Sequence, residues 1–165
     1  MSYALVCSST ANPDAVIAEL MGELDMRPDG HGGLVRKGLF VDVLVHDGTY
    51  TSVDAKLLGA EPNFKIMFDP DDTVEDEEQE VQYWRNISDL MRVCVRFLDR
   101  HQLNGFLTVD NNRILLQRWD GRVTLNEDYA NWSVIEPHKV LGVPFEMAPL
   151  AWPGSRGGRP DRSAT

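Results

Sequence analysis

Few residues of this chain have the types and spacing that catalysis requires. His46 stands beside Asp47, and such a pair could act as a general base with its orienting acid, although Asp47-Gly48 is also typical of a hairpin end. Ser8 and Ser9 follow an apolar run but lack the G-x-S-x-G context of a nucleophile elbow. The glycine-dense stretch 30–33 has neither the G-x-G-x-x-G spacing nor the lysine of a phosphate-binding loop. We therefore predict no catalytic site and no cofactor.

A dense run of carboxylates is the most conspicuous chemical feature of the chain. Calcium loops need carboxylates at fixed alternating positions, a central glycine and a closing glutamate. Pro70 interrupts that alternation and the glycine is missing, so we predict no metal site. Two compatible interpretations remain: a solvated helix start that favours the positive end of the helix dipole, and a surface that binds a basic partner. The candidate partner-binding residues are eight of the 26 acids within twelve positions: Asp69, Asp71, Asp72, Glu75, Asp76, Glu77, Glu78 and Glu80.

The charge of the whole chain points in the same direction. Its 165 residues carry a formal net charge of −10, and the pI is about 4.7. Such a field repels nucleic acid and anionic membranes and attracts basic surfaces, although many proteins are acidic only for solubility. We expect a cytoplasmic protein, because the start lacks a signal peptide, no run approaches a membrane span, and the two cysteines have no redox or zinc-binding spacing, although an internal disulfide between them stays open.

The elements that must position these residues begin with a short strand, Tyr3 to Cys7. Asn12-Pro13 is typical of a helix start, and apolar residues at helical spacing predict a helix from Pro13 to Asp25. The turn residues Arg27 to Gly33 end it. A strand over 39–45 follows, and the Asp47-Gly48 turn predicts that 49–53 pairs back onto it.

The second half of the chain repeats this order. A strand over 63–68 precedes a long amphipathic helix over about 75–101, capped by Thr73 and ended by Asn104-Gly105. The residues that we expect to face the sheet are Trp84, Ile87, Met91, Cys94 and Leu98. Tight turns then separate three strands, which we place at 106–109, 113–118 and about 122–125.

Together these elements predict an α+β fold with the order β-α-β-β and then β-α-β-β-β. Short connections favour a mainly antiparallel sheet with both helices packed on one face. We expect a single α+β domain over residues 1–150, in which 126–150 packs as an extension, and a disordered C-terminal tail over 151–165.

Residues 58–126 resemble a known family. The shared pattern comprises Leu58-Gly59-x-x-Pro62, the strand that ends at Phe68, Leu90-Met91-Arg92, the turn Asn111-Asn112, Arg113 to Arg118 and Gly121 to Asn126. In these features the chain is similar to the immunity proteins of Sit-type bacterial toxin–immunity systems. The resemblance implies a cytoplasmic, non-enzymatic protein that binds and neutralises a cognate toxin domain. From the acidic charge of this chain we expect that toxin to be basic. The alternatives are a small-molecule-binding or enzymatic α+β domain and a subunit of a larger assembly; the oligomeric state stays open.

Overall fold

The computed structural model describes residues 1–7, 12–45, 58 and 64–152. Nine strands form one sheet in the order β2-β3-β4-β5-β1-β6-β7-β8-β9, and all neighbours are antiparallel except β8 and β9, which are parallel. The strands are β1 Tyr3–Cys7, β2 Arg27–Pro28, β3 Leu34–Arg36, β4 Leu39–Val45, β5 Phe64–Pro70, β6 Gly105–Val109, β7 Arg113–Trp119, β8 Arg122–Asn126 and β9 Phe145–Ala148.

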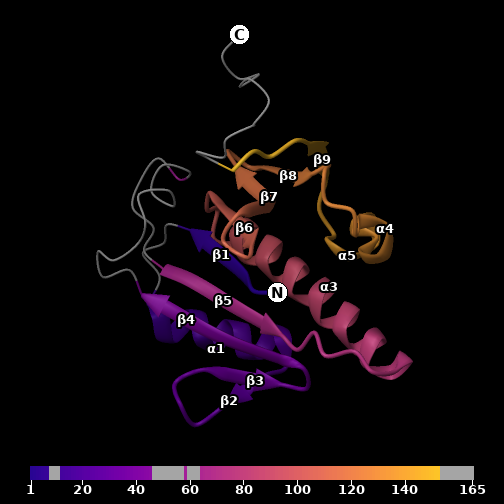
Figure 1. Cartoon of the computed structure of the whole chain (residues 1–165). Coiled ribbons are helices and arrows are strands. Elements are labelled where there is room, and N and C mark those ends of the chain that lie inside the picture. Colours follow the sequence, from indigo (N-terminus) through magenta and orange to yellow (C-terminus); the bar gives the residue numbers. More distant parts are fainter. Residues whose placement is uncertain (8–11, 46–57, 59–63, 153–165) are drawn as a thin grey trace.

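The helices gather on one face of this sheet. They are α1 Pro13–Leu24, α3 Glu77–Arg100, α4 Trp132–Ile135 and α5 Pro137–Val140. α3 contacts β5, β6 and β7, α1 contacts β4, and the two helices contact each other. Figure 1 views the sheet from the opposite face, so that β4 and β5 pass in front of α1. The predicted fold class, α+β with a mainly antiparallel sheet, is confirmed.

The two halves of the chain interleave in the middle of the sheet. β5 and β6 are joined through α3, yet β1 lies between them and is antiparallel to both. Likewise β1 and β4 are joined through α1, and β5 lies between them. This is the split β-α-β arrangement of ferredoxin-like folds, extended by further strands at each edge.

α1 begins as the sequence predicts. Asn12 is the N-cap, and its side chain accepts a hydrogen bond from the backbone N–H of Asp14 at 2.8 Å, while Pro13 occupies the first turn. Asp25 ends the helix in the left-handed conformation (φ 52°) and donates its N–H to the carbonyl of Met21.

α3 supplies much of the core. Ile87, Met91, Cys94 and Leu98 are buried as predicted, whereas Trp84 is only half-buried at the margin of the core. The helix ends at Arg100 with His101 as its C-cap, as predicted, but Gly105, which we expected to end the helix, is the first residue of β6. Gly105 is required there for close packing, because a Cβ would lie 2.8 Å from Leu98 Cδ2 and 2.9 Å from the Val6 carbonyl.

Other elements differ from the sequence prediction because long-range pairing decides them. The turn region after α1 contains β2 and β3, which form an edge hairpin. β5 extends to Pro70, opposite Leu39, so Asp69 belongs to a strand. After residue 126 the chain forms α4, α5 and β9, and Trp152 packs against the cluster around Val6. Some of the predicted features lie outside the described residues. They are the strand 49–53, Ser8-Ser9, His46-Asp47 and residues 153–165.

An ion-pair network joins α1 to α3. Arg100 contacts Glu19 at 2.5 Å and Glu23 at 2.6 Å, and His101 Nε2 lies 2.8 Å from Glu19. The hydrogen bond from Arg100 lowers the pKa of Glu23 below its ordinary value of 4.5, because it stabilises the carboxylate. The network therefore joins α1 to the C-terminal end of α3.

The buried face of α3 can be tested at Met91, which is fully buried. Met91→Ala should lower the free energy of unfolding by about 2–5 kcal/mol, because it removes buried apolar surface and leaves a cavity. Urea melts measure this. Val81→Ala on the same helix, at a residue that is 53% exposed, should change it by less than about 0.5 kcal/mol. Equal effects of the two substitutions would contradict this helix face.

The network predicts a pH dependence of stability. A carboxyl group whose pKa is lowered on folding stabilises the fold above its unfolded pKa, and this contribution is lost as the pH falls from about 4.5 through the folded pKa. Glu23→Gln should therefore be less stable than wild type by up to about 1 kcal/mol at pH 7, and the difference should vanish at low pH. Urea melts at both pH values measure it. The control is Glu127→Gln, because Glu127 is exposed and has no ion pair within the described residues. A difference that persists at low pH would refute the charge-based account.

Candidate partner-binding site

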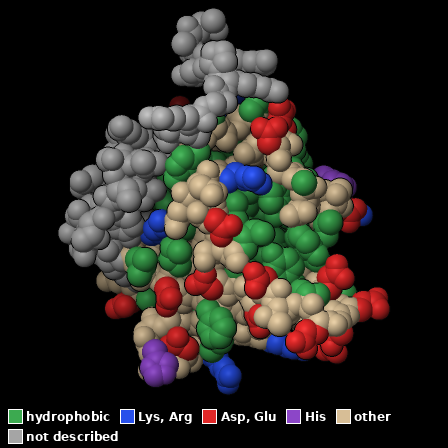
Figure 2. Space-filling model, viewed as in Figure 1, with side chains coloured by type: hydrophobic (Ala, Val, Ile, Leu, Met, Phe, Trp, Pro, Cys, Tyr) green, Lys and Arg blue, Asp and Glu red, His purple; other side chains and the backbone are tan. Residues whose placement is uncertain are grey.

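The acidic segment connects the sheet to the long helix. β5 ends at Pro70, residues 71–76 form the connection, and α3 begins at Glu77. The backbone N–H of Asp71 donates to the carbonyl of Gly38 at 2.9 Å, which holds the connection against the turn between β3 and β4. Every residue from Asp71 to Glu80 is exposed, whereas Asp69 is half-buried on the sheet. In Figure 2 acidic side chains gather toward the lower right, where α3 begins.

The N-cap of α3 is Asp76, and the prediction that Thr73 caps the helix is wrong. The Asp76 side chain accepts the backbone N–H of Gln79 at 2.8 Å. Thr73 lies three residues earlier, in the connection, where its N–H donates to Asp71. Glu77, Glu78 and Glu80 occupy the first turn, where the positive end of the helix dipole favours negative charge. Part of the acidic segment therefore has a structural role.

The eight predicted residues divide by their partners. Five have a partner for the side chain: Asp69 accepts from Ser2 Oγ at 2.6 Å, Asp72 lies 3.1 Å from the Met1 amine, Glu78 lies 3.2 Å from Lys37 Nζ, and Asp71 and Asp76 bind backbone N–H groups. Within the described part of the chain, the carboxylates of Glu75, Glu77 and Glu80 have no such partner. These three, with the exposed Glu78, hold the least compensated charge of the segment.

Four of the eight acids line one cavity of about 360 Å³, which we call the acidic groove. They are Asp71, Glu75, Asp76 and Glu78, and the opposite wall includes Lys37 and Gly38. Asn86, which is buried, also lines it. Its side chain accepts hydrogen bonds from Arg36 at 2.7 and 3.0 Å and donates to the carbonyl of Lys37 at 3.1 Å. This network fixes the β3–β4 turn against α3 and so defines the shape of the groove.

The sheet face opposite the helices carries, beside the predicted Asp69, functional candidates that we did not predict. Phe40 lies directly opposite Asp69, and Asp42 lies opposite Met67, so these side chains share that face. Ser2 joins Asp69 to Asp110, because Asp110 accepts the Ser2 N–H at 2.9 Å and donates its own N–H to the Ser2 carbonyl at 2.8 Å. Figure 2 shows hydrophobic and acidic side chains side by side there. The signal in the sequence was a strand with apolar residues at outward as well as inward positions.

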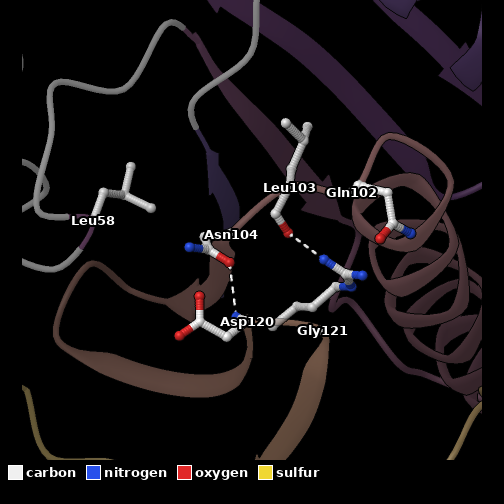
Figure 3. A pocket seen from close by; sticks show the side chains of 7 residues that line it. Leu58, Gln102, Leu103, Asn104, Asp120 and Gly121 are labelled. Atoms are coloured by element: carbon white, nitrogen blue, oxygen red, sulfur yellow. Dashed lines mark hydrogen bonds between the residues drawn. The ribbon is translucent and has the colours of Figure 1, made fainter.

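A second cavity, of about 550 Å³, lies at the far end of α3. Figure 3 shows Leu58 across the opening from Gln102 and Leu103, with Asn104 bonded to the N–H of Asp120 at 3.0 Å. Arg118 also lines it, is almost fully buried, and donates to the carbonyl of Leu103 at 3.0 Å. Arg118 also lies 3.4 Å from the carboxylate of Asp99 in the last turn of α3. Arg118 therefore joins β7 to the end of α3.

The two cysteines are poorly suited to act as nucleophiles. Cys7 and Cys94 are free and buried, and burial raises the pKa of Cys7 to about 12 and the pKa of Cys94 well above 9. Both thiols therefore stay protonated at neutral pH. Across the described residues, no group of three His, Cys, Asp or Glu side chains is arranged to hold a metal ion.

Comparison with known proteins identifies the family. The profile of the SitI3-like family matches residues 1–136, which is most of the chain, and the chain belongs to this family. No curated protein and no solved structure is significantly similar to it. The match extends well beyond the residues that carried the resemblance in the sequence. In the part of the chain that the structure describes, no helix is long and apolar enough to cross a membrane.

The role of Asp76 can be separated from that of its neighbours by stability measurements. Asp76→Ala should lower the free energy of unfolding by about 0.5–2 kcal/mol, because it removes the acceptor for an N–H of the first turn. Asp76→Asn keeps an acceptor and should lose less. Thr73→Ala should have little effect in the same urea melts. A larger loss for Thr73→Ala than for Asp76→Ala would mean that Thr73 is the cap.

Proposed function

We propose that this chain is a non-enzymatic immunity protein that binds and neutralises a cognate bacterial toxin domain in the cytoplasm. Membership of the SitI3-like family supports this function, since the family name denotes immunity proteins of the Sit type. The acidic surface supports a basic partner, because a net charge of −10 and a patch of carboxylates attract positive charge over several ångströms of solvent.

The acidic groove and the first turn of α3 form the proposed contact with the toxin. Their carboxylates are exposed and lie on a rigid frame of β5, α3 and the Asn86 network. Complementary charge raises the association rate and rejects partners of the wrong sign more than it adds affinity. We therefore assign to Asp69, Asp71, Asp72, Glu75, Asp76, Glu77, Glu78 and Glu80 the steering and first docking of the toxin, which the bound protein then occludes.

The function is tested by protection from a cognate toxin domain, which is first identified by pull-down from the producing cell. Cells that express the toxin domain should survive when they also express this chain and die when they express an unrelated acidic protein at the same level. The two purified proteins should form a complex on size-exclusion chromatography. Death despite full expression of the folded chain would refute the proposed function.

The charge of the acidic groove and of the first turn of α3 is tested by association kinetics. Changing Glu75, Glu77, Glu78 and Glu80 together to Gln, with the cap Asp76 kept, should slow association with the toxin domain about tenfold or more at low salt. The wild-type rate should fall steeply as salt is added, whereas the rate of this variant should not. Stopped-flow fluorescence measures both rates.

The matched control carries the same change of net charge elsewhere. It replaces the exposed Asp14, Asp120, Glu127 and Asp128 by the corresponding amides. At 0.1 M salt this control should slow association much less than the groove variant does, because charges more than about 10 Å from the contact are largely screened at that ionic strength. Equal rates for the groove variant and the control variant would show that only overall charge matters and would remove the groove from the site.

A further inference from the structure

The open face of the sheet breaks the usual pattern of an exposed antiparallel sheet. Such a face normally alternates buried apolar residues with solvated polar ones. In β4 the inward residues Leu39 and Val41 are buried as expected, but the outward residue Phe40 is a large aromatic with 51% of its surface exposed. The half-buried Val35 of β3 lies beside it on the same face. None of the helices α1, α3, α4 and α5 supplies a described residue that covers this aromatic ring.

Two carboxylates lie beside this aromatic side chain, and a third lies further across the same face. Asp69 lies directly opposite Phe40 on β5, and Asp42 lies two residues further along β4 on the same face. Ser2 then joins Asp69 to Asp110 through hydrogen bonds of 2.6 and 2.9 Å, so their positions are fixed. An exposed aromatic side chain with charged residues at its margin resembles an interface hot spot, in which a polar rim borders a central apolar residue. We call Phe40, Asp42, Asp69 and Asp110 the Phe40 patch.

The Phe40 patch is continuous with the acidic groove. Asp69 belongs to the patch and is followed, after Pro70, by Asp71 of the groove. The hydrogen bond from the Asp71 N–H to the Gly38 carbonyl places the groove beside the start of β4, two residues before Phe40. A partner that the groove attracts by charge would therefore contact the patch as well, because the two form one continuous surface.

We propose that the Phe40 patch is the docking anchor for the toxin, in which Phe40 enters an apolar pocket that the toxin rims with Lys and Arg side chains. This inference rests on the proposed immunity function. It assigns most of the free energy of toxin binding to the sheet and not to the start of α3. Charge complementarity selects the occupant. A second copy of this chain would bring Asp42, Asp69 and Asp110 against their own equivalents, and like charges facing one another oppose association.

The test compares three variants for binding to the purified cognate toxin domain, once pull-down from the producing cell has identified it. Phe40→Thr, which keeps a residue suited to strands, should weaken the affinity about 30-fold or more by isothermal titration calorimetry. Asp42→Lys should weaken it as well, since it places a positive charge against the basic rim. Val134→Ala, at a residue of equal exposure (49%) on α4, should leave the affinity within about twofold.

The outcomes separate this inference from the proposed function. If wild type binds the toxin and Phe40→Thr and Asp42→Lys bind equally well, the patch is not the anchor, although the immunity function stands. If wild type neither binds the toxin nor protects cells, the immunity function itself fails. Circular dichroism melts establish that each variant is folded. A wild-type dimer in sedimentation experiments that Phe40→Thr dissociates would assign the patch to a second copy and overturn the proposal.

Discussion

The structure depends on the burial of β1 at the centre of the sheet. All five residues of this strand are buried, and its backbone pairs with β5 on one side and with β6 on the other. Both neighbours come from the second half of the chain, so the N-terminal strand can be buried only when that half has formed its own strands. Each half therefore completes the sheet of the other, and the ion pairs between α1 and α3 join them again on the covered face.

This interleaving determines where a partner can bind. The split β-α-β units place α1 and α3 on the same face, and the opposite face around β4 is left for other contacts. At the edge of that face, the polypeptide turns from β5 into α3, and the turn is where the acids are concentrated. Several of them have structural bonds, such as the cap formed by Asp76, whereas Glu75, Glu77 and Glu80 carry charge without a partner among the described residues. Some carboxylates of the segment thus hold the backbone in position, whereas their neighbours attract positive charge.

Sequence reasoning succeeded where the determinants are local. The amphipathic period of α3, the Asn12-Pro13 cap of α1 and the tight turns between β6, β7 and β8 are all encoded within a few residues. It failed where a distant partner decides, as in β9, which exists only through pairing with β8, and in the last two residues of β5, which pair with Leu39 and Phe40. For the same reason the acidic segment could be found from its density, but the Phe40 patch could not, because its four residues come from three separate stretches of sequence.

The charge around Phe40 also explains how an exposed aromatic residue can be tolerated on the part of the sheet around β4. Exposed apolar residues on β-sheets invite association with further copies, and natural proteins oppose this with charged neighbours. Asp42 and Asp69 supply that protection against a like-charged copy, yet the same carboxylates attract a basic surface. At the adjoining helix start, the repulsion among first-turn acids is partly offset by the helix dipole, so the fold can hold a charge density that would be more costly elsewhere. In the proposed function, the same arrangement of charge favours a basic toxin over a second copy of the protein.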